Sequence, residues 1–235
     1  SIFRARGFST AGFVSWPADR PWRDELLAGL DRHARVERDL DAVREAVAWL
    51  GEQDFGDGRG RYLWVHLDGP TFPFEPGVAP SILGERDHAT LYVDPAYDGP
   101  ADGGEEYRNS ARVPALTDAD REHVVALYDG EVAQVNALAS YLLDLDRYLG
   151  ATAGAWERTL TVVAGTHGVA LFDPVEDERH GPAQRLADPG LHVPLLVHHP
   201  DSLTGRRILS EVVETCDVHA TLLDWCLPGG EDHPR

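Results

Sequence analysis

The sequence lacks lysine and methionine altogether, and it contains only two cysteines. All 21 basic residues are therefore arginines, so any contact with an anion must come from arginine, histidine or backbone N–H groups. Cys216 and Cys226 give no disulfide framework, because ten residues along one helix would separate them by about 15 Å. This is compatible with a reducing compartment and slightly favours a cytoplasmic location. No apolar run approaches the roughly 20 residues of a transmembrane helix, so we expect no membrane span.

The chain is strongly acidic, with 40 acidic residues and a formal net charge of −19 at pH 7. This charge argues against nucleic acid or an anionic membrane surface as a partner. Two explanations of the acidic, lysine-free composition stay open. One is work in concentrated salt, which screens the repulsion between like charges. The other is a GC-rich genome, whose codons favour arginine and aspartate.

The length of 235 residues and a hydrophobic content of 43% predict one globular domain over residues 1–235. Apolar strand-like runs alternate with amphipathic helical patterns, which predicts an α/β fold with a doubly wound, mainly parallel sheet flanked by helices. We expect strands at 11–15, 62–67, 159–165 and 192–198, and helices at 24–50, 117–149 and 209–225. We interpret 172–189 as a long polar loop.

The segment Thr159–Leu171 points most directly to a functional site. An apolar, β-branched run stops at Gly165-Thr166-His167-Gly168. In open α/β sheets, ligands bind at the ends of such strands. His167 is therefore a candidate ligand for a metal or an anion, and the alternative is a loop histidine hydrogen-bonded to the backbone.

Acidic residues elsewhere have simpler interpretations. Asp118 and Asp120 follow the N-cap candidate Thr117, where negative charge suits the helix dipole. We expect Asp129 and Glu131 to cap or solvate the same helix. The many Arg and Asp residues within 24–50 are expected to form a solvated face.

Four segments, in this order, resemble the sulfatase family of the alkaline-phosphatase superfamily. They are RGFSTAGFVSW (6–16), YLWVHLDGPTFPFEP (62–76), YDGEVAQVNALASYLLDLDRYL (128–149), and HVPLLVHHP (192–200) followed by CDVHATLLDW (216–225). The resemblance implies that the chain matches the C-terminal two-thirds of the family's catalytic domain. A preceding segment would then hold the family's nucleophile motif and an aspartate pair, and we assign no catalytic residue within this chain.

Three motif positions differ from the family's pattern. Ser15 stands in the place of the family's lysine before Trp16. Thr71 falls where the family has the histidine of Pro-His-x-Pro-Tyr. Thr166 replaces the metal-ligand aspartate of Asp-His-Gly, whereas His167 is retained.

The resemblance also implies candidate site residues. Thr71 and His180 would contact substrate, and Thr166 and His167 would lie at the metal position. Asp173 and Asp177 could add carboxylates near His167. A divalent cation such as Ca²⁺ or Mg²⁺ needs several carboxylate oxygens, and a neutral hydroxyl with one imidazole does not replace them. We therefore assign no cofactor to this chain, and we expect Ca²⁺ or Mg²⁺ only if the protein is active.

Three hypotheses about function follow. The first is a sulfatase-like protein that is catalytically impaired and serves as a scaffold or binding subunit. The second is an active sulfuric-ester or phosphoric-ester hydrolase whose nucleophile lies upstream of this chain, acting on a small-molecule or glycan sulfate ester. The third is a phosphotransferase or phosphodiesterase of the same superfamily. The sequence leaves the oligomeric state open.

Overall fold

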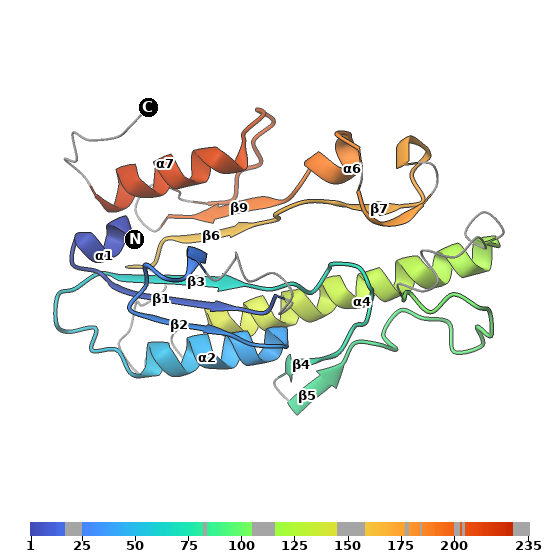
Figure 1. Ribbon diagram of the computed structural model, residues 1–235, viewed down its shortest axis with the longest axis horizontal. Coiled ribbons are helices and arrows are strands. Elements are labelled where there is room, and N and C mark those ends of the chain that lie inside the picture. Colours follow the sequence, from blue (N-terminus) through green and yellow to red (C-terminus); the bar gives the residue numbers. More distant parts are fainter. Residues whose placement is uncertain are drawn as a thin grey trace.

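We describe a computed structural model, which places residues 1–16, 25–81, 84–104, 116–144, 158–176, 179–183, 185–199, 203 and 205–227. The helices are α1 (Ile2–Ala5), α2 (Asp39–Gly51), α4 (Asp118–Leu143), α6 (Asp188–Leu191) and α7 (Thr215–Cys226), with the 3₁₀ turn η4 (Pro174–Glu176). The strands are β1 (Ser9–Val14), β2 (Arg32–Arg35), β3 (Arg61–His66), β4 (Val78–Ser81), β5 (Gly84–Asp87), β6 (Thr161–Ala164), β7 (Val169–Leu171), β8 (His180–Pro182) and β9 (Leu195–His198) (Figure 1).

A three-stranded parallel sheet in the order β2-β1-β3 forms the centre of the first half of the chain. One face of β1 presents Ala11 and Phe13, both fully buried, to Ala42, Ala46 and Trp49 of α2. The opposite face packs Val14 and Trp16 against Leu27 and Leu30. Fully buried apolar side chains stabilise a fold by about 1.5–3 kcal/mol each, so packing on both faces of this sheet contributes to the core.

Helix α4 begins where the sequence predicts. The Thr117 hydroxyl accepts a hydrogen bond from the Asp120 N–H at 3.2 Å, and the Asp120 carboxylate accepts one from the Thr117 N–H at 2.8 Å. This reciprocal capping box satisfies two N–H groups that a helix start otherwise leaves unpaired. Leu138 of α4 packs with Leu40 and Val43 of α2, which joins the two helices beside the sheet. The predicted end of this helix, at 149, lies outside the described residues.

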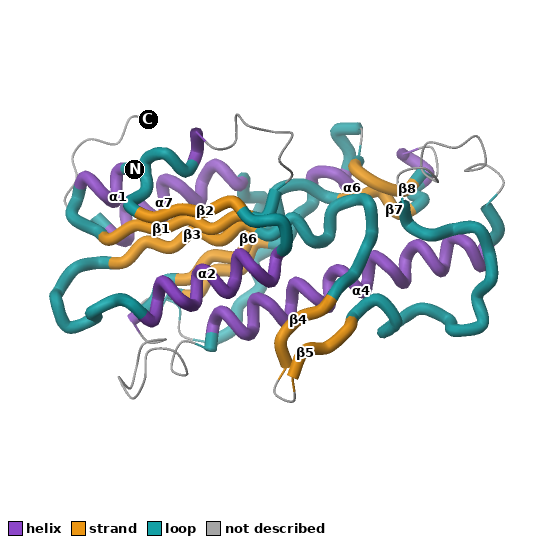
Figure 2. Tube along the Cα trace, turned by 60° about the horizontal axis from the view of Figure 1, so that its bottom comes forward, coloured by secondary structure: helices purple, strands orange, loops and turns teal. Residues whose placement is uncertain are grey.

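The prediction of a parallel sheet is confirmed for three strands, and other pairings differ from it. The strands predicted at 159–165 and 192–198 exist as β6 and β9, but they pair antiparallel with each other. β4 pairs with β5 and β7 with β8, also antiparallel. Figure 2 shows the β7–β8 pair near the N-terminal half of α4. The doubly wound arrangement stays a prediction.

Two predicted segments are wrong in their secondary structure. The helix expected over 24–50 begins only at Asp39, and Arg32–Arg35 forms β2 instead. Backbone pairing with β1 overrides the local helical pattern there. The polar loop expected over 172–189 contains β8, because His180–Pro182 pairs with Val169–Leu171. Three-residue strands carry too few side chains to show a period.

The two cysteines lie on α7 and are free thiols, as their spacing predicts. Among the helices of the described ranges, none combines the length and the hydropathy needed to cross a bilayer.

Candidate functional site

Ser15 follows the central strand β1 and is buried, with 4% of its surface exposed. Its hydroxyl donates to Oδ1 of Asp39 and accepts a hydrogen bond from the Asp68 N–H at 3.1 Å. The same Asp68 N–H lies 2.9 Å from Oδ1 of Asp39. The Ser15 side chain therefore links the ends of β1 and β3 to the start of α2.

Asp39 is the first residue of α2 and is 6% exposed. Burial raises the pKa of Asp39, because a charged carboxylate loses solvation in the interior. Hydrogen bonding to Ser15 and Asp68 acts in the opposite direction. Oδ2 of Asp39 faces the backbone of Gly69. The Gly69 N–H also opposes the rise in the pKa of Asp39. Oδ2 itself makes no well-aligned hydrogen bond to a described residue.

Glu131 of α4 is the second buried carboxyl group, with 4% exposure. Its Oε1 accepts a hydrogen bond from the Glu75 N–H at 2.8 Å. Burial raises the pKa of Glu131 to about 8, and the negative charges of Asp39, Glu75 and Asp68 add to the rise. Glu131 therefore keeps its proton at neutral pH.

Gly69 lies between these two carboxyl groups. A Cβ atom built there would come within 2.6 Å of Oδ2 of Asp39, 2.6 Å of Cγ2 of Val135 and 3.6 Å of Oε2 of Glu131. Asp39 and Glu131 thus approach the same glycine from α2 and α4. Only glycine allows both helices to come this close to the backbone after β3.

The sequence-based interpretation of these two acids is wrong. Asp39 and Glu131 were expected on solvated helix faces, and both are buried. A signal for Glu131 is present in the sequence: Val124, Glu131 and Leu138 recur at seven-residue intervals, two helical turns apart, and all three are buried on one face. Asp129, by contrast, is exposed as expected.

The structure connects two of the candidate substrate residues, Thr71 and His180, through an aromatic contact. Thr71 is half-buried in the loop after β3, and the next residue, Phe72, lies 5.5 Å from the ring of His180. Phe172 lies 5.2 Å from His180. His180 is 3% exposed, so its imidazole is held between two aromatic rings and not at the surface.

Thr166 and His167 are both exposed, in the turn between β6 and β7. Nδ1 of His167 donates to the Gly168 carbonyl at 3.1 Å, which matches the alternative of a loop histidine bonded to the backbone. The flanking glycines have a packing role. A side chain at Gly165 would lie 3.0 Å from Pro194, and one at Gly168 would collide with the Pro189 carbonyl.

The residues at the predicted metal position do not fit a divalent cation. Within the described ranges, no three His, Cys, Asp or Glu side chains are placed so that they could hold a metal ion. The Asp173 carboxylate accepts a hydrogen bond from the Leu171 N–H at 3.0 Å and so stabilises its own turn. Asp177 lies outside the described residues. Thr166 and His167 alone supply no carboxylate, which a hard cation such as Ca²⁺ prefers.

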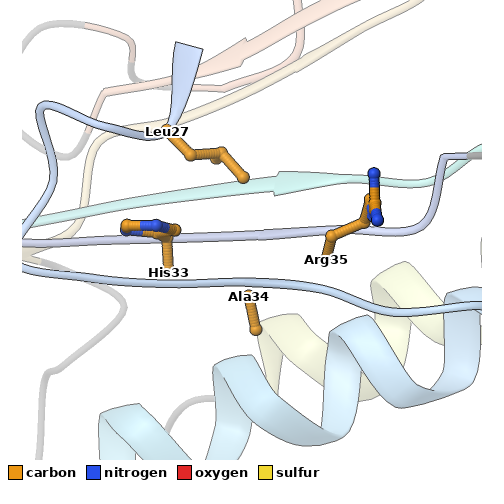
Figure 3. A pocket seen from close by; sticks show the side chains of 4 residues that line it. All are labelled: Leu27, His33, Ala34 and Arg35. Atoms are coloured by element: carbon orange, nitrogen blue, oxygen red, sulfur yellow. The ribbon is translucent and has the colours of Figure 1, made fainter. Parts of the chain in front are cut away.

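A separate hollow of about 290 Å³ opens on β2, lined by Leu27, His33, Ala34 and Arg35. In Figure 3 the side chain of Ala34 points toward α2, away from those of Leu27 and Arg35. None of the predicted site residues lines this hollow.

Comparison with solved structures identifies the fold. The lipoteichoic acid synthase LtaP from Listeria monocytogenes superimposes with a TM-score of 0.50 over 86% of this chain and 46% of its own, at 14% sequence identity. BT4656 in complex with its substrate, D-glucosamine-2-N,6-O-disulfate, gives a TM-score of 0.50 over 86% of this chain and 55% of its own, at 12% identity.

These two structures support the predicted resemblance at the level of fold alone. The chain spans about half the length of the solved structures it matches. Neither a protein-family model nor the sequence of a curated protein matches it.

Proposed function

We propose that this chain is a sulfatase-like protein whose own residues do not hydrolyse sulfate esters, and that it acts as a binding or scaffolding part of a larger assembly. The observation that carries this proposal is the hydrogen bond from Ser15 to the buried Asp39. Sulfate recognition needs positive charge or hydrogen-bond donors aimed at the anion. The Ser15 hydroxyl instead donates to a carboxylate, and Glu131 lies on the other side of the same glycine.

The loop at Thr166 and His167 supports the same proposal. Its two side chains are exposed, and its glycines serve to pack the turn against residues 189–194. Together with the altered positions Ser15 and Thr71, this leaves the motif positions that the structure describes without the carboxylate, lysine and histidine that the resemblance implies for sulfate-ester cleavage.

Two measurements test this proposal. We expect no hydrolysis by the 235-residue protein when it is offered aryl sulfates, sulfated glucosamines and phosphate mono- and diesters with Ca²⁺ or Mg²⁺. We also expect calorimetry to detect no stoichiometric, tight binding of either cation. The variant Thr166→Asp restores the carboxylate of the family pattern, and it should still bind neither cation tightly, because a single carboxylate is too few ligands. Turnover of any ester, or one tight Ca²⁺ per chain in the unaltered protein, contradicts the proposal.

A second candidate is an active sulfuric-ester or phosphoric-ester hydrolase in which a segment beyond these residues supplies the nucleophile. Exposed apolar side chains on the β6–β9 pair favour it: Val163 is 41% and Leu196 60% exposed, and the register pairs them directly. A soluble domain ordinarily covers such a face. Because one similar structure holds a disulfated glucosamine, sulfated sugars are the first substrates to offer to the full-length gene product. Turnover by that product, lost when its candidate nucleophile is replaced, would favour this alternative.

A further inference from the structure

We propose that the pair Asp39 and Glu131 holds one proton in the folded protein, and that the loop of residues 68–76 detaches from α4 more easily as the pH rises. This pH response arises within the fold and does not rest on the proposed function. Amide hydrogen exchange tests it, because exchange reports the opening of the loop and not activity.

The two carboxyl groups hold this loop from two helices. Oδ1 of Asp39, on α2, accepts from the Asp68 N–H at 2.9 Å. Oε1 of Glu131, on α4, accepts from the Glu75 N–H at 2.8 Å. Both ends of the 68–76 loop are therefore anchored by buried carboxyl oxygens, and Gly69 lies against the remaining two oxygens.

The surroundings of Glu131 disfavour a second negative charge. Among the described residues, the charges that act on it most strongly are those of Asp39 from α2 and of Asp68 and Glu75 from the loop, and all three are acids. Nearby on α4, the neutral Gln134 side chain accepts a hydrogen bond from the Gly77 N–H. Because Glu131 is 4% exposed, water does little to screen the repulsion, and one proton on the pair relieves it.

Opening the loop exposes Glu131 to water and lets it ionise at its ordinary pKa. The closed form keeps its proton up to about pH 8, whereas an exposed glutamate loses its proton near 4.5. The open form thus binds fewer protons across this window, so opening becomes easier as the pH rises toward 8 and no easier above it. The released proton passes to solvent.

Opening of the loop has a consequence beyond the two carboxyl groups. Phe72 and Phe74, on the same loop, are 6% and 1% exposed and belong to the cluster beside the N-terminal half of α4. Phe72 also contacts His180. A proton lost from the pair is therefore coupled to the surroundings of Thr71 and His180, the two residues that the sequence associates with substrate.

Amide hydrogen exchange of the whole chain, followed by mass spectrometry from pH 5 to 9, tests the proposal. After correction for the intrinsic exchange rate, we expect protection of the peptide containing 68–76 to fall by up to about tenfold per pH unit between pH 5 and 8, and then to level off. In Glu131→Gln the amide cannot ionise, and protection should stay within about twofold across the range. The matched control Glu122→Gln, an exposed position of the same helix, should behave like the unaltered protein.

Asp39→Asn provides an independent variant. It keeps an oxygen acceptor for Ser15 and Asp68 but removes the negative charge beside Glu131, so protection should level off at a lower pH. Protection of the loop that does not change with pH in the unaltered protein would overturn the proposal. An equal fall in the protection of the loop with rising pH in the Glu131→Gln variant would overturn it as well.

Discussion

The residues after β1 and the residues after β6 are both polar ends of apolar strands, yet they have opposite environments. Ser15, after β1, is 4% exposed and hydrogen-bonded to Asp39. Thr166 and His167, after β6, are exposed. Within the described residues, the ring of His167 hydrogen-bonds to the carbonyl of the adjacent Gly168. A polar residue at a strand end is therefore not by itself evidence of a functional site. At the end of β1 it stabilises the fold, and after β6 it occupies a turn whose glycines pack against a neighbouring segment.

The largest expected difference between the two regions is in the pH dependence of stability. Glu131 has a pKa of about 8 in the folded protein and an ordinary value near 4.5 when unfolded. The unfolded chain therefore binds fewer protons in this window, and the free energy of unfolding should fall by up to about 1.4 kcal/mol per pH unit as the pH rises from 5 to 8. Urea denaturation of the unaltered protein and of Glu131→Gln at several pH values measures the effect as a difference between the two. A constant difference across this range would contradict the account.

Removing the acceptor at Asp39 should produce the next largest effect. Asp39→Ala removes the acceptor shared by the Ser15 hydroxyl and the Asp68 N–H, which then keep only the His66 carbonyl at 3.2 Å and the Ser15 Oγ at 3.1 Å. Each hydrogen bond to a charged group contributes about 1.5–3 kcal/mol, and the remaining partners offset part of that loss. We expect a loss of about 2 kcal/mol in the free energy of unfolding at pH 6, measured by urea denaturation. Asp39→Asn, which keeps an oxygen acceptor, is the control and should lose clearly less. Equal losses in the two variants would show that the hydrogen bonds are not the cause.

Gly69→Ala tests the close approach of the two helices directly. The added methyl group would lie 2.6 Å from both Oδ2 of Asp39 and Cγ2 of Val135, so these atoms must move. Overpacking of this kind costs about 1–3 kcal/mol, which thermal denaturation would detect. Gly51→Ala is the matched control, because a Cβ atom there meets nothing within 4 Å. If Gly69→Ala left the stability unchanged, the carboxyl groups would not be held against the glycine.

The smallest effects are expected after β6. Thr166→Ala and His167→Ala remove exposed side chains, so each should change the free energy of unfolding by less than about 0.5 kcal/mol. The same denaturation measurements apply. A loss of more than about 2 kcal/mol in either variant would show that this turn has a structural role comparable to that of Ser15 and Asp39.

Parts of the fold follow from the sequence because the local pattern and the tertiary structure agree. The apolar run in β3 and the Thr117–Asp120 cap of α4 are examples, since period and capping chemistry suffice to predict both. β2 was missed because its sequence, RHAR, has no apolar alternation, and its pairing with β1 decides its conformation. The antiparallel pairing of β6 with β9 depends on contacts that no local pattern contains.

The buried carboxyl groups were missed for a different reason. In a chain with 40 acidic residues, one glutamate on a long helix stands out only by its position. The seven-residue spacing from Val124 through Glu131 to Leu138 gives that position, whereas Asp39 carries no comparable signal. The candidate residues Ser15 and Thr71 were found through the family resemblance, but their environments required the structure.

The measurement that tests the central claim most directly is a carbon-13 NMR titration of the side-chain carboxyl of Glu131 in the unaltered protein. The account predicts a midpoint near pH 8, accompanied by a chemical-shift change at the Asp39 carboxyl over the same range. A midpoint near the ordinary value of 4.5 would contradict it. In that case the Glu131 carboxyl group on α4 would be as open to solvent as the turn after β6.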